Sequence, residues 1–265
     1  MPKANFSIPR VIVSLVILML ACSLPEAVVD FLPEKTAGET EIWQEEVDAI
    51  KTLTRSQPIP GFLIDPETPP SGELFDPNDL LVPLDHLSLQ SGYTLDFVYR
   101  YDGIGGKPIL YARKMTDPPL ERFEDGSNAH QHPYLNAIVC DGTPEAYFQW
   151  VLLHMMGDQF YLYWHAGYHD TEIIASQERL EALVLEMRSS EFGFPFTRAQ
   201  QRQALRINPA PVVEIEDQIV KVRVVSFSKW RGFTESFFTI SRTAPHQVLD
   251  LEENNLMEYD CGVMF

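Results

Sequence analysis

The stretch that decides the fold lies near the end of the chain, at residues 212–251: VVEIEDQIVKVRVVSFSKWRGFTESFFTISRTAPHQVLDL. Apolar and polar residues alternate along it, and a period of two is typical of β-strands with one buried face. The alternating runs cover 212–215, 219–227, 233–240 and 248–251. Turn residues stand at 216–217, at 231–232 and near 254–255. Strands joined by such short turns pair antiparallel, so an antiparallel sheet is predicted here.

Further strands are predicted earlier in the chain. Residues 93–100 alternate, the glycine-rich segment 102–107 forms a turn, and residues 109–113 return as a second strand. Residues 135–140 are expected to form another short strand. Residues 57–83 contain seven prolines, which excludes a long regular element there.

Helical spacing of apolar residues predicts helices over 41–55, 176–189 and 197–206, with Ser176 as the N-cap of the second. Combined with the strands, this predicts an α+β fold, mainly antiparallel sheet with a few packed helices. Residues 147–166 leave two interpretations open. We favour a hairpin around Gly157 and Asp158, while a helix that begins near Thr143 and ends at Gly157 is the alternative.

The chain starts with a hydrophobic leader. Lys3 and Arg10 supply positive charge, and an apolar run over residues 11–21 leads to Cys22. That run is shorter than the about 20 residues that a membrane-spanning helix needs, and its layout is typical of a secretory signal. An ordinary cleaved signal and an uncleaved anchor are the alternatives to the interpretation that follows.

Met19, Leu20 and Ala21 before Cys22 resemble the lipobox of bacterial lipoproteins. The resemblance covers residues 1–22 only, and no family is recognised for the globular body. It implies that Cys22 carries a diacylglyceryl group with fatty acids such as palmitate. It also implies an extracytoplasmic protein, lipid-anchored at the cell membrane or outer membrane. The expected organisation is a signal peptide (1–21), a lipidated tether (22–39), a helix with a proline-rich segment (40–92) and an α+β globular domain (93–265).

The chain is strongly acidic. Its formal net charge is −18, and removal of residues 1–21 makes it −20, because Lys3 and Arg10 are lost and no acid is. Such a chain repels nucleic acid, so we expect no nucleic-acid partner. After Cys22 two cysteines remain, Cys140 and Cys261, and outside the cell they are candidates for one disulfide. Two separate buried thiols are the alternative.

Two groups of side chains are candidate sites. If the hairpin forms, one of its faces carries Trp150, His154, Tyr161, Tyr163 and His165, and an aromatic face with polar tips suits ligand or partner binding. Separately, four histidines could hold a metal: His130, His132, His165 and His169. Their spacing matches no known zinc motif.

No catalytic signature is present in the sequence, so we predict a noncatalytic binding or structural lipoprotein with no cofactor. Its partners would be the membrane, through the lipid, and an envelope protein or a small ligand. The alternative is an extracytoplasmic metal-dependent hydrolase that uses the histidine cluster.

Overall fold

The computed structural model describes residues 37–65, 67–120, 133–164, 170–189 and 193–262. All of these belong to one unit, Glu34–Phe265. The leader and Cys22 lie outside the described residues, as do His130, His132, His165 and His169.

The predicted antiparallel sheet is confirmed and is the largest in the described residues. Its strand order is β10-β9-β8-β6, and β7 also pairs with β8. The strands are β6 (Glu172–Ile174), β7 (Val212–Ile215), β8 (Ile219–Ser228), β9 (Gly232–Ser241) and β10 (Val248–Glu258). All its neighbouring strands run antiparallel. Strand β6 was not predicted, because a strand of three residues is too short to show an alternation of apolar and polar residues.

Two smaller sheets lie apart from this one in the pairing pattern. The predicted hairpin of β2 (Tyr93–Tyr101) and β3 (Gly105–Lys114) is confirmed, and β5 (Tyr163–Trp164) pairs with β3. Strand β1 (Leu87–Leu89) pairs with β4 (Ile138–Cys140). The predicted strand over 135–140 is therefore wrong in its first half, where a 3-10 helix, η3 (Pro133–Ala137), takes its place.

The favoured hairpin over 147–166 is wrong. Residues Pro144–Met156 form helix α2, whose N-cap Thr143 accepts a hydrogen bond from the backbone of Ala146. Proline at the first helical position and glycine after the last agree with this start and end. The helix is apolar on nearly all sides, so it shows no helical period in the sequence, and such a helix is stable only when it is covered all round.

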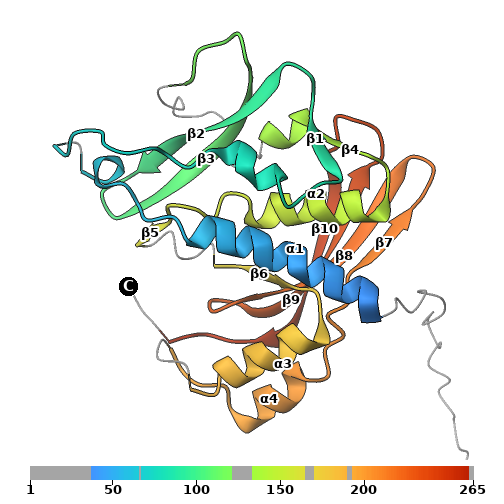
Figure 1. Cartoon of the computed structure of the whole chain (residues 1–265). Coiled ribbons are helices and arrows are strands. Elements are labelled where there is room, and N and C mark those ends of the chain that lie inside the picture. Colours follow the sequence, from blue (N-terminus) through green and yellow to red (C-terminus); the bar gives the residue numbers. More distant parts are fainter. Residues whose placement is uncertain (1–36, 66, 121–132, 165–169, 190–192, 263–265) are drawn as a thin grey trace, which may run out of the picture. The chain divides into compact units, whose positions relative to one another are not determined.

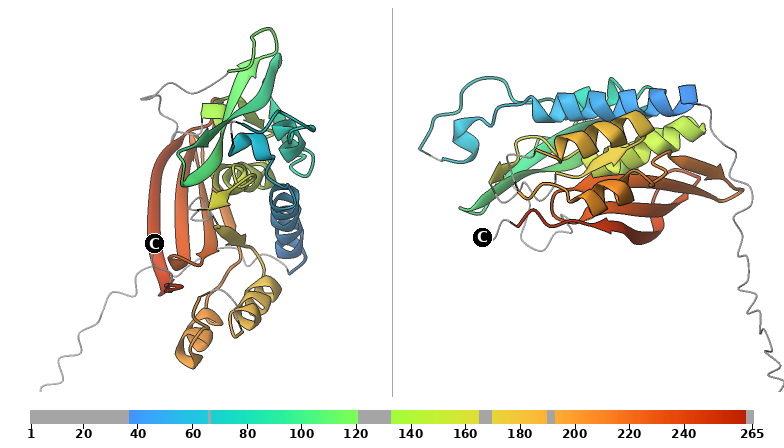
Figure 2. Two further views of the ribbon diagram at one scale, coloured as in Figure 1. Left: turned by 90° about the vertical axis from the view of Figure 1, so that its left-hand side faces the viewer. Right: turned by 90° about the horizontal axis from the view of Figure 1, so that it is seen from below.

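Helix α2 is covered because it lies between the large sheet and helix α1 (Ala37–Arg55), as Figure 1 and Figure 2 show. On the α1 side, the ring of Trp43 stacks on Phe148 with centroids 4.6 Å apart and planes 9° apart. On the sheet side, Val220, Val222 and Val224 of β8 belong to the same core. The predicted segments 40–92 and 93–265 therefore share one hydrophobic core.

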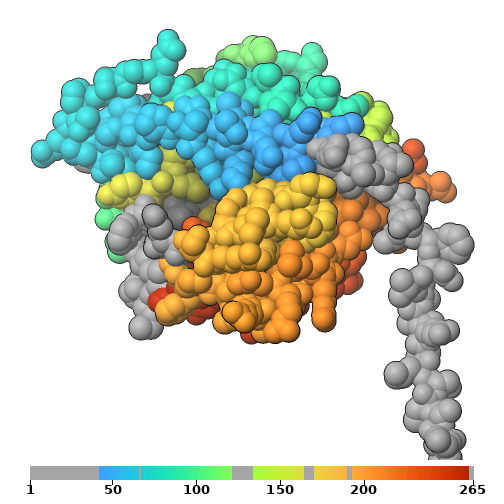
Figure 3. All heavy atoms as spheres, turned by 60° about the horizontal axis from the view of Figure 1, so that its bottom comes forward, coloured from blue at the N-terminus to red at the C-terminus, as the bar shows by residue number. Residues whose placement is uncertain are grey.

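A second hydrophobic cluster covers the opposite face of the sheet. Helices α3 (Gln177–Glu186) and α4 (Arg198–Ala204) contribute Leu183, Val184 and Ala204, which pack with Val225 and Phe227 of β8. The two helices form one surface in the space-filling view of Figure 3. Ser176 caps α3, as predicted, by accepting from the backbone of Arg179.

The buried carboxylate of Glu172 connects three elements. It lies on β6, is 5% exposed, and accepts hydrogen bonds from Lys51 of α1 and Arg179 of α3. Burial alone would raise the pKa of Glu172, but the hydrogen bonds from Arg179 and Lys51 outweigh it and lower that pKa.

Of the two alternatives for the cysteines, the candidate disulfide does not form and the separate thiols do. Cys140 and Cys261 are both free thiols. Cys140 packs against the core around α2, whereas Cys261 belongs to the cluster under α3 and α4. Since the two cores lie on opposite faces of the sheet, the thiols cannot approach each other.

The proline-rich segment holds two short 3-10 helices, η1 (Gly61–Leu63) and η2 (Pro77–Leu81).

Candidate functional site

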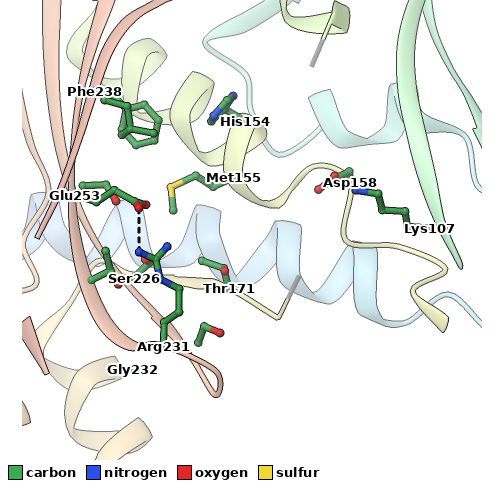
Figure 4. Close-up of a pocket in the computed structure, with 14 residues that line it drawn as sticks. Lys107, His154, Met155, Asp158, Thr171, Ser226, Arg231, Gly232, Phe238 and Glu253 are labelled. Carbon is green, nitrogen blue, oxygen red and sulfur yellow. Dashed lines mark hydrogen bonds and ion pairs between the residues drawn. The ribbon is translucent and has the colours of Figure 1, made fainter. Parts of the chain in front are cut away.

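A cavity of about 250 Å³ opens where helix α2 ends. One wall is the face of β8, β9 and β10 that α2 covers further along, and the other is made by the end of α2 and by Lys107 of β3 (Figure 4). The cavity exists because α2 stops at Met156 while β8 continues to Ser228, so the helix leaves this part of the sheet face uncovered.

The sheet wall of the cavity is lined by hydroxyl groups. Along β8, the residues that face α2 change from valine to serine at Ser226. On β9, Thr234 lies opposite Ser226 in the register, and Ser236 is two residues further on the same face. Ser226, Thr234 and Ser236 are 5%, 5% and 1% exposed. On the face toward α2, strands β8 and β9 are therefore polar only where they border the cavity.

The helix wall combines an imidazole with apolar groups. His154 and Met155 reach the cavity from α2, and Figure 4 shows His154 near Phe238 of β9. The His154 ring lies parallel to Trp150 with centroids 5.7 Å apart and edge-on to Phe238 at 5.5 Å. These two contacts fix the orientation of the imidazole.

Charges of both signs surround the cavity. Arg231 donates to Glu253 across 3.0 Å at one side, and Lys107 and Asp158 lie next to each other at the other (Figure 4). The lining thus holds two cationic and two anionic groups. Because the charges balance, the interior presents no strong field of either sign.

The end of β8 is held beside the cavity by Asp170. Its carboxylate accepts from the Ser228 hydroxyl at 2.7 Å and from the Lys229 backbone at 3.2 Å. Burial raises the pKa of Asp170, and these hydrogen bonds oppose the rise. Asp170 therefore positions the strand end and is already fully engaged by the protein.

Comparison with known proteins does not identify this chain. No family model, curated protein or solved structure matches it.

The predicted aromatic face does not form, because it depended on the hairpin. Trp150 is 1% exposed inside the core, and Tyr161 is 3% exposed with its hydroxyl accepting from the backbone of Phe75. Tyr163 lies on β5, and His165 is outside the described residues. Of the four members of the predicted set that the structure describes, only His154 lines the cavity.

The hydroxyl groups of the cavity were missed by the sequence analysis, although a signal for them exists. Val220, Val222, Val224, Ser226 and Ser228 occupy alternate positions of one strand. A change from valine to serine along the buried face of a strand indicates that a different part of the protein, or a cavity, lies against that face from there on.

The described part of the chain holds no metal cluster, and the thiol of Cys140 is not activated. No group of three or more His, Cys, Asp or Glu side chains there could hold a metal. The four histidines of the predicted metal site lie outside it. Burial raises the pKa of the Cys140 thiol to about 12, so it stays protonated at neutral pH and is a poor nucleophile.

The described helices include none long and apolar enough to span a bilayer.

Outside the cavity, Glu46 of α1 is a partly buried carboxyl group beside α2. One oxygen accepts from Gln149 at 2.8 Å, while the other is buried without a hydrogen-bond partner. Burial raises the pKa of Glu46 to about 7, and Asp85 adds to the rise. The folded protein therefore prefers the neutral carboxyl group.

This preference predicts a stability that falls as the pH rises. An unfolded chain ionises Glu46 near its ordinary pKa of 4.5, so between about pH 4.5 and 7 the folded state loses stability relative to the unfolded state. We expect Glu46→Gln to raise the free energy of unfolding by about 1–2 kcal/mol at pH 8, after allowance for solvent screening, and by less at pH 5. Urea denaturation at the two pH values measures the difference. Glu45→Gln, at an exposed neighbour, is the control, and an equal effect of both variants would refute the role of burial.

Proposed function

We propose that the protein is a noncatalytic binding lipoprotein of the cell envelope, held by lipid on Cys22, that takes a small polar ligand into the cavity at the end of α2. The observation that carries the proposal is the hydroxyl-lined face of β8 and β9, which is polar only where α2 leaves it uncovered. Buried polar groups require hydrogen-bond partners, and a ligand supplies them.

The chemistry of the lining supports binding over catalysis. The Arg231 and Glu253 charges neutralise each other, and the carboxylate of Asp170 is engaged by the end of β8.

A thermal-shift screen of a broad library of small polar compounds tests the cavity. We expect a compound of this kind to raise the melting temperature of the protein, because a ligand that binds only the folded state stabilises it by mass action. Thr234→Phe, which places an aromatic ring in the cavity, should abolish the shift. Thr239→Phe, on the opposite face of the same strand, should leave it unchanged. A library without a stabilising compound, or shifts equal in both variants, would contradict the proposal.

The lipid anchor needs a separate test. Mass spectrometry of the protein purified from membranes of a lipoprotein-processing host should show a chain that begins at Cys22 and carries acyl groups. Cys22→Ser should prevent acylation and leave the leader uncut. A mature chain that begins at another residue, without lipid, would refute the anchor and leave the cavity proposal standing.

A further inference from the structure

The hydroxyl groups of the cavity lack partners within the described protein. Ser226, Thr234 and Ser236 each carry a hydroxyl that can donate one hydrogen bond and accept others. No hydrogen bond joins these hydroxyls to another described residue, and none of them is among the described side-chain atoms that are fully buried without a partner, so each oxygen reaches the open space of the cavity. Ser228, by contrast, is bonded to Asp170. Three adjacent donor–acceptor groups are therefore left for whatever occupies the cavity.

The arrangement of the three hydroxyls favours a ligand that carries several hydroxyl groups of its own. Ser226 and Thr234 are cross-strand partners, and Ser236 lies between Val224 and Glu253 in the register. Cross-strand neighbours and alternate residues on one strand face are close enough to contact one small molecule together. A ligand hydroxyl can both donate and accept a hydrogen bond, so it can pair with each of the three protein hydroxyls whether that hydroxyl donates or accepts.

The charges beside the cavity favour a neutral ligand. The Arg231 guanidinium is bonded to Glu253, and Lys107 lies next to Asp158 (Figure 4). An anionic ligand would have to displace Glu253 from Arg231, and a cationic one would have to displace Arg231 from Glu253. A neutral molecule leaves the ion pair of Arg231 and Glu253 in place and can still form hydrogen bonds with charged groups at the rim of the cavity.

Beside the hydroxyls, the cavity also offers an apolar surface, which includes Phe238 two residues beyond Ser236 on the same face of β9. Phe238 and Met155 line it, and Leu251 stands at its edge. A sugar ring matches this division, because its hydroxyls lie around the rim of the ring and its C–H groups form an apolar face that packs on aromatic side chains. The volume of about 250 Å³ is below the usual range of about 300–1,000 Å³ for drug-sized ligands, so one ring fits better than a chain of rings.

We infer that the ligand of this cavity is a neutral monosaccharide or a polyol of similar size, bound by the hydroxyls of Ser226, Thr234 and Ser236 and packed against the neighbouring ring of Phe238 on the same sheet wall. The inference rests on the proposed function and adds the ligand class to it. It excludes sugar phosphates and free amino acids as preferred ligands, since both are charged.

Saturation-transfer NMR and calorimetry on the full chain in detergent test the ligand class. Three groups of probes are compared: neutral sugars and polyols (glucose, galactose, mannose, xylose and sorbitol), glucose 6-phosphate, and amino acids (alanine and glutamate). We expect at least one compound of the first group to bind and the other two groups to bind at least tenfold more weakly.

Thr234→Val removes one hydroxyl and keeps the branched shape that suits a strand, so the variant should fold. Affinity for the neutral sugar should fall about three- to tenfold, as for the loss of one hydrogen bond. Thr239→Val, with its side chain on the other face of β9, should leave affinity unchanged. Ser226→Ala provides a second variant with the same expected loss.

The remaining outcomes separate the two proposals. Binding of only the charged probes, weakened by Thr234→Val, would overturn the sugar class and leave the binding function intact. Sugar binding that is equal in Thr234→Val and Thr239→Val would overturn the assignment of the hydroxyls. If no probe binds, the sugar class is refuted, and the binding function then depends on the wider thermal-shift screen.

Discussion

Gly232→Ala is expected to lower the free energy of unfolding by at least about 3 kcal/mol. Gly232 opens β9 and lines the cavity, with a backbone φ of +85° that side-chain-bearing residues rarely adopt. A Cβ at this position would lie 2.1 Å from the carbonyl oxygen of Met257 and 2.7 Å from the backbone nitrogen of Tyr259. Met257 belongs to β10, and Tyr259 follows directly after this strand. Neither backbone atom can therefore move aside without breaking the pairing of β9 and β10. Urea denaturation followed by circular dichroism measures the loss.

Gly92→Ala is the matched control for this prediction. Gly92 has a φ of +82°, but a Cβ there would meet nothing within 4 Å. The control therefore carries the conformational penalty alone, about 1 kcal/mol, without the clash. Equal losses in the two variants would show that the contact with β10 does not decide the need for glycine at position 232.

Trp43→Ala is expected to cost about 3–5 kcal/mol of stability. Trp43 is 1% exposed and stacks on Phe148 of α2, so its removal leaves a cavity between the two helices and takes away the aromatic pair. The effect would be large because α2 is covered by the sheet on one side and depends on α1 on the other. Chemical denaturation followed by far-ultraviolet circular dichroism measures it, since this signal does not depend on the tryptophan itself.

Ile42→Ala tests the same helix from its outer side. Ile42 is 55% exposed, and its truncation should change stability by less than about 0.5 kcal/mol. A loss below 1 kcal/mol in Trp43→Ala would mean that α1 contributes little to the core. That result would favour the sequence-based division of the chain at 92/93 over the shared core.

The start of the mature chain and the candidate ligand are independent questions. The sequence alone predicts the leader and Cys22 as the lipidated residue, and the described residues do not include either. The cavity, in turn, owes nothing to the leader. Its hydroxyls come from β8 and β9, and its helix wall comes from α2.

What the sequence by itself determined is the antiparallel sheet and the local starts of helices. Strands β8 and β9 follow an alternation that arises because neighbouring residues of a strand face opposite sides of the sheet. Strand β10 was predicted only over 248–251, and the turn predicted near 254–255 is wrong, because β10 continues to Glu258. The caps at Ser176 and Thr197 are equally local, since each bonds a backbone amide three residues away. Such features depend only on near neighbours in the chain, so the pattern of residues is enough to predict them.

Only the tertiary structure decided the nature of residues 144–156 and the existence of the cavity. A helix covered on one side by α1 and on the other by the sheet has no polar face, so α2 carries no period that separates it from a strand. The cavity depends on where α2 ends relative to β8, which is a relation between segments some 70 residues apart in the chain. The fate of Cys140 and Cys261, which are 121 positions apart in the chain, could not be predicted either, because the face of the sheet on which each thiol packs is fixed by the packing of whole elements.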